Sequence, residues 1–212
     1  MSILKNTTLV VIPAWNEQES ISEVVSKIQS LAFPLDILVI DDGSSDNTAL
    51  RAREKKALVV SLPFNLGYGA ALQTGFIYAV DNNYDYLIHL DADGQHDPSS
   101  LPALFKEIKE SDADIVIGSR FLKNSAYLNT FSRKIGVYIF RSIIKLITKQ
   151  DITDPTSGFQ ALKRKAFKLY SEIYPSDFPD ADVIIASYFC SFKIKEIPVK
   201  IYPKPSGKSM HS

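Results

Sequence analysis

Two aspartates one residue apart follow a short apolar run, and they are the residues of this chain best suited to chemistry. Residues 86–90 (YLIHL) are mostly apolar, as in a buried strand, and Asp91 and Asp93 come directly after them. The carboxyl ends of strands in an α/β sheet are where ligands usually bind. Adjacent carboxylates repel each other unless a positive charge lies between them, and Mg²⁺ or Mn²⁺ prefers oxygen ligands. The spacing therefore predicts a divalent-cation site that shares its ion with a substrate phosphate.

Three other interpretations compete for this segment. An EF-hand loop also begins with Asp-x-Asp, but counted from Asp91 its glycine would fall at His96 and its closing glutamate at Pro102, so that interpretation fails. A phosphatase with an aspartyl nucleophile would need its aspartate pair near the start of the fold, and this chain does not have that arrangement. A solvated acidic turn stays open as the simplest alternative.

Length and composition fit one globular domain. The chain has 212 residues, of which 45% are apolar and 23% charged, and this is ordinary for a soluble protein. Lys+Arg and Asp+Glu both number 24, so the net charge does not indicate nucleic-acid binding. The single Cys190 excludes an internal disulfide and fits a reducing compartment. No run approaches the ~20 apolar residues of a membrane span, and residues 9–12 are too short for a signal peptide. We therefore expect a cytoplasmic protein.

Short apolar runs alternate with amphipathic segments over the first 120 residues. The runs that predict strands are 8–12, 35–40, 58–62, 86–90 and 114–117. Helical segments of ~12 residues separate them, which predicts an α/β fold with a doubly wound, mostly parallel sheet and helices on both faces. Further on we expect loops over 121–132 and 151–159, helices over 133–149, 163–171 and 180–190, and a final strand including 197–201. Pro198 indicates that this last strand lies at a sheet edge.

Polar groups follow three of the predicted strands. They lie in the segments 13–17 (PAWNE), 41–44 (DDGS) and 91–93 (DAD). In a parallel sheet these strand ends share one edge, so the groups should converge on one cleft, which a nucleoside diphosphate and a metal would fit. Asp42 could accept from a base N–H or a ribose hydroxyl, and Trp15 could stack on the base. No G-x-G-x-x-G follows the first strand, which disfavours a dinucleotide fold.

These segments resemble family 2 glycosyltransferases of the GT-A fold over essentially the whole chain. The matching motifs are Pro13-x-Trp15-Asn16-Glu17, Val39-Ile40-Asp41-Asp42-Gly43-Ser44, Asn65-x-Gly67-x-Gly69-x-Ala71, Asp91-Ala92-Asp93-x-Gln95 and Gly118-Ser119-Arg120. Within the family, residues 154–159 (DPTSGF) and 196–199 (EIPV) are similar to the polyprenyl-phosphate hexosyltransferase branch, which is dolichyl-phosphate mannosyltransferase-like. The chain departs from this branch at Trp15, where tyrosine is common, at Lys204, where arginine is expected, and at Met210, where lysine is expected.

The resemblance implies a role for each matching residue. The nucleotide-sugar pocket would be lined by Pro13, Trp15, Glu17, Ile40, Asp42, Asp91 and Ala92. The metal ligands would be Asp91, Asp93 and Gln95, although Gln95 fits a plain turn residue equally well. Arg120 would face the diphosphate or the acceptor phosphate, with a surface ion pair as its alternative, and Arg133 and Lys204 would contact the acceptor phosphate.

The implied reaction is inverting transfer of a hexose or N-acetylhexosamine from a UDP- or GDP-sugar to undecaprenyl or dolichyl phosphate. A phosphate acceptor is already ionised near pH 7, whereas a sugar hydroxyl needs a general base. Asp182 is the candidate base or acceptor-positioning group, and a helix N-terminal carboxylate favoured by the helix dipole is an equal alternative. Two other functions stay open: a glycosyltransferase with a hydroxyl acceptor in polysaccharide or lipid-linked glycan synthesis, and a non-catalytic nucleotide-sugar-binding subunit.

The segment 133–149 bears on the acceptor side. Its cationic residues Lys134, Arg141, Lys145 and Lys149 lie on one stripe of a helix that is otherwise largely apolar. Such a helix suits a membrane surface with anionic lipid, or else a buried or dimer-forming helix. We therefore expect a nucleotide-sugar and metal half over 1–120 and an acceptor half over 121–212. We expect the protein to lie peripherally at the cytoplasmic face of a membrane or to bind a membrane protein.

Overall fold

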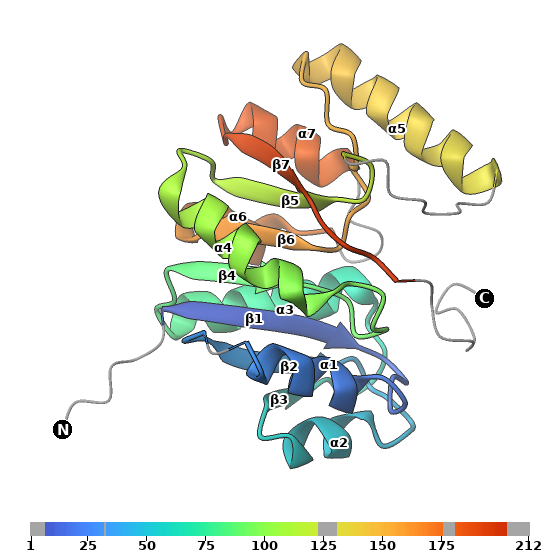
Figure 1. The fold of residues 1–212 in the computed structure, drawn as a ribbon, viewed down its shortest axis with the longest axis vertical. Helices are drawn as coiled ribbons and strands as arrows, with labels where there is room; N and C mark the ends of the chain where they lie inside the picture. The colour runs from blue at the N-terminus through green and yellow to red at the C-terminus, as the bar shows by residue number, and fades with distance from the viewer. Residues whose placement is uncertain (1–6, 32, 123–130, 176–180, 203–212) are drawn as a thin grey trace.

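One sheet organises the protein in a computed structural model that describes residues 7–31, 33–122, 131–175 and 181–202 (Figure 1). Its strands are β1 Thr8–Ala14, β2 Asp36–Asp41, β3 Leu58–Ser61, β4 Tyr86–His89, β5 Ile115–Ser119, β6 Gln160–Lys163 and β7 Ile194–Pro198. Its helices are α1 Ile21–Gln29, α2 Thr48–Glu54, α3 Tyr68–Asp81, the 3₁₀ turn η1 Pro98–Ser100, α4 Leu101–Glu110, α5 Phe131–Thr148, α6 Arg164–Ile173 and α7 Ala181–Phe189. The strand order among these residues is β3-β2-β1-β4-β6-β5-β7.

Helices cover both faces of the sheet because its central strands are apolar on both sides. Leu9 and Val11 of β1 pack into the cluster that includes α3, α6 and α7, whereas Val10 and Ile12 pack into the cluster that includes α1, α2 and α4. All four side chains are fully buried. Strands buried on both faces are typical of parallel α/β sheets. The predicted doubly wound α/β architecture is therefore confirmed.

The strand β6 was not expected from the sequence. It is only four residues long and pairs antiparallel with β4 on one side and β5 on the other, whereas the other paired strands of the described sheet are parallel. A run this short gives too little alternation to be recognised. Its first residue, Gln160, lies opposite both His89 and Ile117. The segment before β6 therefore reaches the edge where β4 and β5 end.

The last strand is displaced toward the N-terminus from its predicted position. β7 covers Ile194–Pro198 and lies at the sheet edge, as Pro198 indicated. The apolar alternation continues beyond it because Val199 packs in the core and Ile201 forms an isolated bridge with His96. The chain after β7 thereby returns to the loop that follows β4.

Candidate active site at the carboxyl edge of the sheet

Parallel pairing brings the polar strand ends to one edge of the sheet. The register of β1 places Ala14 beside Asp41 of β2 and Val11 beside His89 of β4. Asp42 follows β2 directly, and Asp91 follows β4 after one residue, Leu90, as expected if these strand ends share one edge. The sheet thus positions the candidate residues from three strands on the same side of the molecule.

Asp91 is surrounded by donors. Tyr68 Oη donates to Asp91 Oδ1 at 2.9 Å, and His96 Nε2 lies 3.1 Å from Asp91 Oδ2. Burial by itself would raise the pKa of the Asp91 carboxyl, but the hydrogen bonds from His96 and Tyr68 lower it to about 2. Asp91 is therefore ionised at neutral pH.

Gly158 approaches the same carboxylate from the segment before β6. A Cβ atom at this position would lie 2.7 Å and 2.9 Å from the two Asp91 oxygens and 2.9 Å from Tyr68 Oη. No side chain fits there, so glycine is required by the close approach. The loop over 151–159, which the sequence assigned to the acceptor half, therefore contacts the candidate metal ligand directly.

Asp93 and Gln95 lie in the tight turn after Asp91. Asp93 Oδ1 accepts from the Gln95 N–H at 3.0 Å, and Gly94 between them has φ +74°. Among the described residues, no group of three or more His, Cys, Asp or Glu side chains is arranged to hold a metal by itself. Two carboxylates with further ligands from phosphate and water are the usual Mg²⁺ arrangement. The residues present therefore fit a cation that is shared with a substrate diphosphate.

The end of β1 contributes three of the expected nucleotide-pocket residues. Pro13 is buried within β1, and Trp15 after it is partly buried. Glu17 is buried, its N–H donates to Thr48 Oγ1 at 2.8 Å, and its carboxylate accepts from Ser20 Oγ at 2.7 Å. Of these three, only Trp15 has more than a small exposed area for contact with a base.

Asp42 connects the end of β2 to the loop before α3. Its two oxygens accept from the N–H groups of Leu66 and Gly67 at 2.8 and 3.0 Å. Burial raises the pKa of the Asp42 carboxyl, and these two amide bonds offset part of that increase. Contact with a base or ribose would therefore use the remaining lone pairs of an already hydrogen-bonded carboxylate.

The other two expected pocket residues are apolar and buried. Ile40 is 0% exposed and Ala92 is 1% exposed, each in one of the two core clusters. Their side chains pack in the core, so only their backbone atoms would line a pocket at this edge.

Arg120 forms a buried ion pair with Asp154. Its Nε and one terminal nitrogen donate to the two Asp154 oxygens at 2.7 and 2.6 Å, and its backbone N–H donates to Asp154 Oδ2 at 2.9 Å. The same terminal nitrogen donates to Thr156 Oγ1 at 2.8 Å. Arg120 is 8% exposed and Asp154 is 0% exposed. The guanidinium that was expected to face a phosphate therefore already binds a carboxylate.

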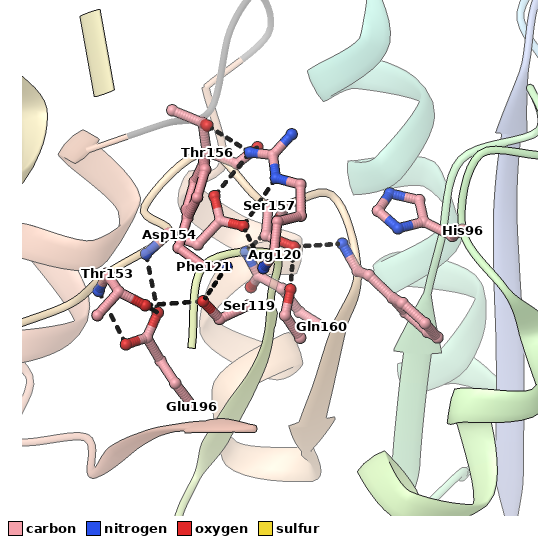
Figure 2. Close-up of polar contacts among 12 residues, drawn as sticks. His96, Ser119, Arg120, Phe121, Thr153, Asp154, Thr156, Ser157, Gln160 and Glu196 are labelled. Carbon is pink, nitrogen blue, oxygen red and sulfur yellow. Dashed lines mark hydrogen bonds and ion pairs between the residues drawn. The ribbon is translucent and has the colours of Figure 1, made fainter. Parts of the chain in front are cut away.

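Glu196 ties the same loop to the edge strand β7. Its oxygens accept from the N–H groups of Thr153 and Asp154 at 2.8 and 2.9 Å and from Thr153 Oγ1 at 3.0 Å. Burial raises the pKa of the Glu196 carboxyl, although these hydrogen bonds oppose the increase. Figure 2 shows Arg120 facing the Asp154 carboxylate, while Glu196 faces Thr153 and the backbone of Asp154. The two segments that suggested the narrower resemblance thus meet in space.

The remaining candidates lie on the acceptor side. Asp182 is exposed in the first turn of α7, which begins on the side of the sheet where β5 and β7 end (Figure 1). The side chain of Arg133 and all of Lys204 lie outside the described residues. The structure therefore does not test the two acceptor-phosphate candidates.

Sequence reasoning assigned no role to Tyr68, His96, Gly158 or Glu196. All four stand inside or directly beside the motifs that carried the resemblance, which is the signal that could have found them. His96 meets a carboxylate only five residues away, but the contacts of the other three join segments far apart in the chain, so spacing alone could not show their partners.

Comparisons with known proteins show the family of this chain. Residues 9–170 match the family model described as Glycosyl transferase family 2. The chain is 32% identical to the undecaprenyl-phosphate mannosyltransferase of Micrococcus luteus, over 96% of this chain and 87% of that protein. It is 28% identical to the UDP-N-acetylglucosamine–dolichyl-phosphate N-acetylglucosaminyltransferase of Methanococcus voltae, over 90% and 84% respectively.

A solved structure shares the fold. The glucosyl-3-phosphoglycerate synthase of Mycobacterium tuberculosis, in complex with Mn²⁺, UDP and glucosyl-3-phosphoglycerate, has a TM-score of 0.69 at 21% identity, over 96% of this chain and 73% of that one. The predicted GT-A fold and the resemblance to family 2 are confirmed. This chain therefore belongs to glycosyl transferase family 2, and it is a glycosyltransferase enzyme.

Proposed function

We propose that this chain is an inverting, metal-dependent glycosyltransferase that moves a hexose or N-acetylhexosamine from a UDP- or GDP-sugar to undecaprenyl or dolichyl phosphate. The observation that carries the proposal is the ionised Asp91 beside Asp93 at the end of β4. The names of the M. luteus and M. voltae relatives support a polyprenyl-phosphate acceptor. The Mn²⁺ and UDP held by the M. tuberculosis synthase support a cation and a nucleoside diphosphate in this fold.

Residues 1–120 would bind the donor. Asp91 and Asp93 would hold Mg²⁺ or Mn²⁺, with Gln95 as a further oxygen ligand, and Trp15 would stack on the base. The bound cation would supply neutralisation of the negative charge that develops on the departing diphosphate, which is often a large catalytic contribution. Asp42 and Glu17 would position the nucleoside side of the pocket through the loops to which they are hydrogen-bonded.

Residues 121–212 would present the acceptor. A polyprenyl phosphate oxygen is ionised near pH 7 and needs no base, so Asp182 would position the acceptor rather than deprotonate it. The exposed position of the Asp182 carboxylate favours the second candidate function, transfer to a sugar hydroxyl, because that acceptor requires a general base. Whether Asp182 positions the acceptor or acts as a general base therefore depends on which acceptor the enzyme uses.

An acceptor screen with Asp182→Asn tests both functions. The purified protein, Mn²⁺ and a panel of UDP- and GDP-sugars should release nucleoside diphosphate faster when a short polyprenyl phosphate is added. With that acceptor we expect Asp182→Asn to keep turnover within a few-fold, whereas a hydroxyl acceptor would lose about 10²- to 10⁴-fold. Asp81→Asn, an exposed acid at the end of α3, is the control. No product with any polyprenyl phosphate would contradict the proposal.

The exposed face of α5 supports a location at a membrane surface. Ile143, Leu146 and Ile147 are 41%, 82% and 41% exposed, while Ile144, on an adjacent side of the helix, is buried. Lys145 is 60% exposed at its side chain, but it projects from another side of the helix, and its ammonium and Arg141 both pair with Asp151. Within the described residues, no helix combines the length and apolar character that crossing a bilayer requires. We propose that this face contacts an anionic lipid surface from the side.

Leu146→Asp with Ile147→Asp should release the protein from anionic vesicles, because it replaces two exposed apolar side chains with charges that repel the lipid. The expected result is loss of most co-sedimentation with phosphatidylglycerol vesicles at low salt. Ile77→Asp, which changes an apolar residue on α3 that is 45% exposed, should sediment like the wild type. A wild-type protein that never sediments with such vesicles would remove the membrane proposal.

A further inference from the structure

Both oxygens of Asp91 already accept a hydrogen bond from a side chain. Tyr68 Oη and His96 Nε2 lie 2.9 and 3.1 Å from Oδ1 and Oδ2 respectively. An ionised carboxylate offers about four lone-pair positions. Two side-chain donors therefore fix the plane of the carboxylate and leave half of its acceptor capacity for another partner.

His96 is buried in a way that packing alone does not explain. It is 5% exposed and its ring lies 5.1 Å, centre to centre, from that of Phe159. Its Nδ1 makes no hydrogen bond to any described residue, and a buried acceptor without a partner costs stability. An apolar ring would pack on Phe159 without that cost, so the hydrogen bond to Asp91 is what the imidazole contributes.

The two donors come from segments that are themselves held in place. Tyr68 is the first residue of α3, directly after the amides that bind Asp42. The His96 backbone forms a bridge with Ile201, and flanking bonds join Asp97 N–H to the Lys200 carbonyl and Tyr202 N–H to the Gln95 carbonyl at 3.1 and 2.8 Å. Donors on fixed backbone hold an acceptor more precisely than donors on mobile loops.

The third side of the carboxylate is closed by Gly158. Its backbone leaves no space for a Cβ between itself and the Asp91 oxygens. The Asp91 carboxylate therefore packs against the loop over 151–159 at this glycine, while the two hydrogen bonds hold its oxygens. Partners that orient a ligand in this way typically contribute 10–100-fold to metal affinity.

We propose that Tyr68 and His96 are positioning residues that preset the Asp91 carboxylate for the donor-bound cation. The inference rests on the proposed function of Asp91 as a metal ligand. Loss of either hydrogen bond should therefore weaken metal binding more than nucleotide binding, because neither bond is made to the nucleotide.

The test measures Mn²⁺ binding directly, by electron paramagnetic resonance of free Mn²⁺ in the presence of saturating UDP or GDP. Tyr68→Phe and His96→Phe should each weaken Mn²⁺ binding about 10-fold or more, because each removes one donor and keeps the ring. His96→Gln should recover most of the affinity, because its amide nitrogen can again donate to Asp91. Nucleotide binding without metal, measured by calorimetry, should change less than two-fold.

Tyr84→Phe is the matched control, because Tyr84 Oη also donates to a carboxylate, that of Asp36 at 2.7 Å. It should leave Mn²⁺ affinity unchanged while altering thermal stability about as much as Tyr68→Phe. Folded Tyr68→Phe and His96→Phe variants that bind Mn²⁺ like the wild type would overturn the inference; if His96→Phe does not fold, Tyr68→Phe alone decides it. A wild type that binds no Mn²⁺ with either nucleotide would instead overturn the proposed metal function itself, and this inference with it.

Discussion

Asp93→Asn is expected to abolish Mn²⁺-dependent binding of the donor nucleotide while leaving the protein folded. The change keeps the shape of the side chain and its acceptor oxygen for the Gln95 N–H, but it removes one negative charge. At an effective dielectric constant of about 20, a unit charge roughly 4 Å away contributes about 4 kcal/mol, or about a thousandfold in affinity. Isothermal titration of UDP and GDP with and without Mn²⁺ measures this loss.

Asp97→Asn provides the matched control for Asp93→Asn. Asp97 lies in the same loop and carries the same charge, but its carboxylate accepts from the Ser99 N–H and the Tyr202 hydroxyl at 2.9 and 3.0 Å. Its neutralisation should change Mn²⁺-dependent binding by no more than a few-fold. Unchanged Mn²⁺-dependent calorimetry in Asp93→Asn would show that the cation, if bound, is held elsewhere.

The fold was predictable wherever several apolar residues in a row had to be buried. Val10, Val11 and Ile12 cannot be exposed together, so β1 and the parallel strands like it follow from hydrophobicity alone. β6 could not be predicted because its four residues include Gln160 and Lys163 at the ends, which leaves only Ala161 and Leu162 as an apolar signal. Its place comes from pairing with β4 and β5, which are distant in the sequence.

The site was predictable in outline but not in its contacts. The strand-end rule located Asp91 and Asp93, and the structure places them at the carboxyl edge. What each polar group binds depends on tertiary structure: Asp42 accepts from the loop before α3, and Arg120 donates to the Asp154 carboxylate. Both outcomes depend on loop conformations that no local pattern encodes.

Arg120→Met should be the most destabilising single substitution considered for this site. It leaves the Asp154 carboxylate buried without its guanidinium partner and near a second, partly buried carboxylate, that of Glu196. Removing one partner of a buried ion pair typically costs about 3–5 kcal/mol of unfolding free energy. Equilibrium urea unfolding measures the loss. Arg120→Met/Asp154→Leu should recover part of it, because the buried charge is then gone from both sides.

Arg141→Met tests whether the stability contributed by an ion pair depends on its burial or on its two-point geometry. Arg141 makes the same two-point contact with Asp151, at 2.9 Å for both bonds, but the two side chains are 41% and 48% exposed. Exposed pairs contribute about 0–1 kcal/mol, so this variant should unfold at nearly the wild-type urea concentration. If Arg120→Met lost no more stability than Arg141→Met, the Arg120–Asp154 pair would not hold the loop over 151–159 in place. The guanidinium would then be available to bind a phosphate at little cost to the fold.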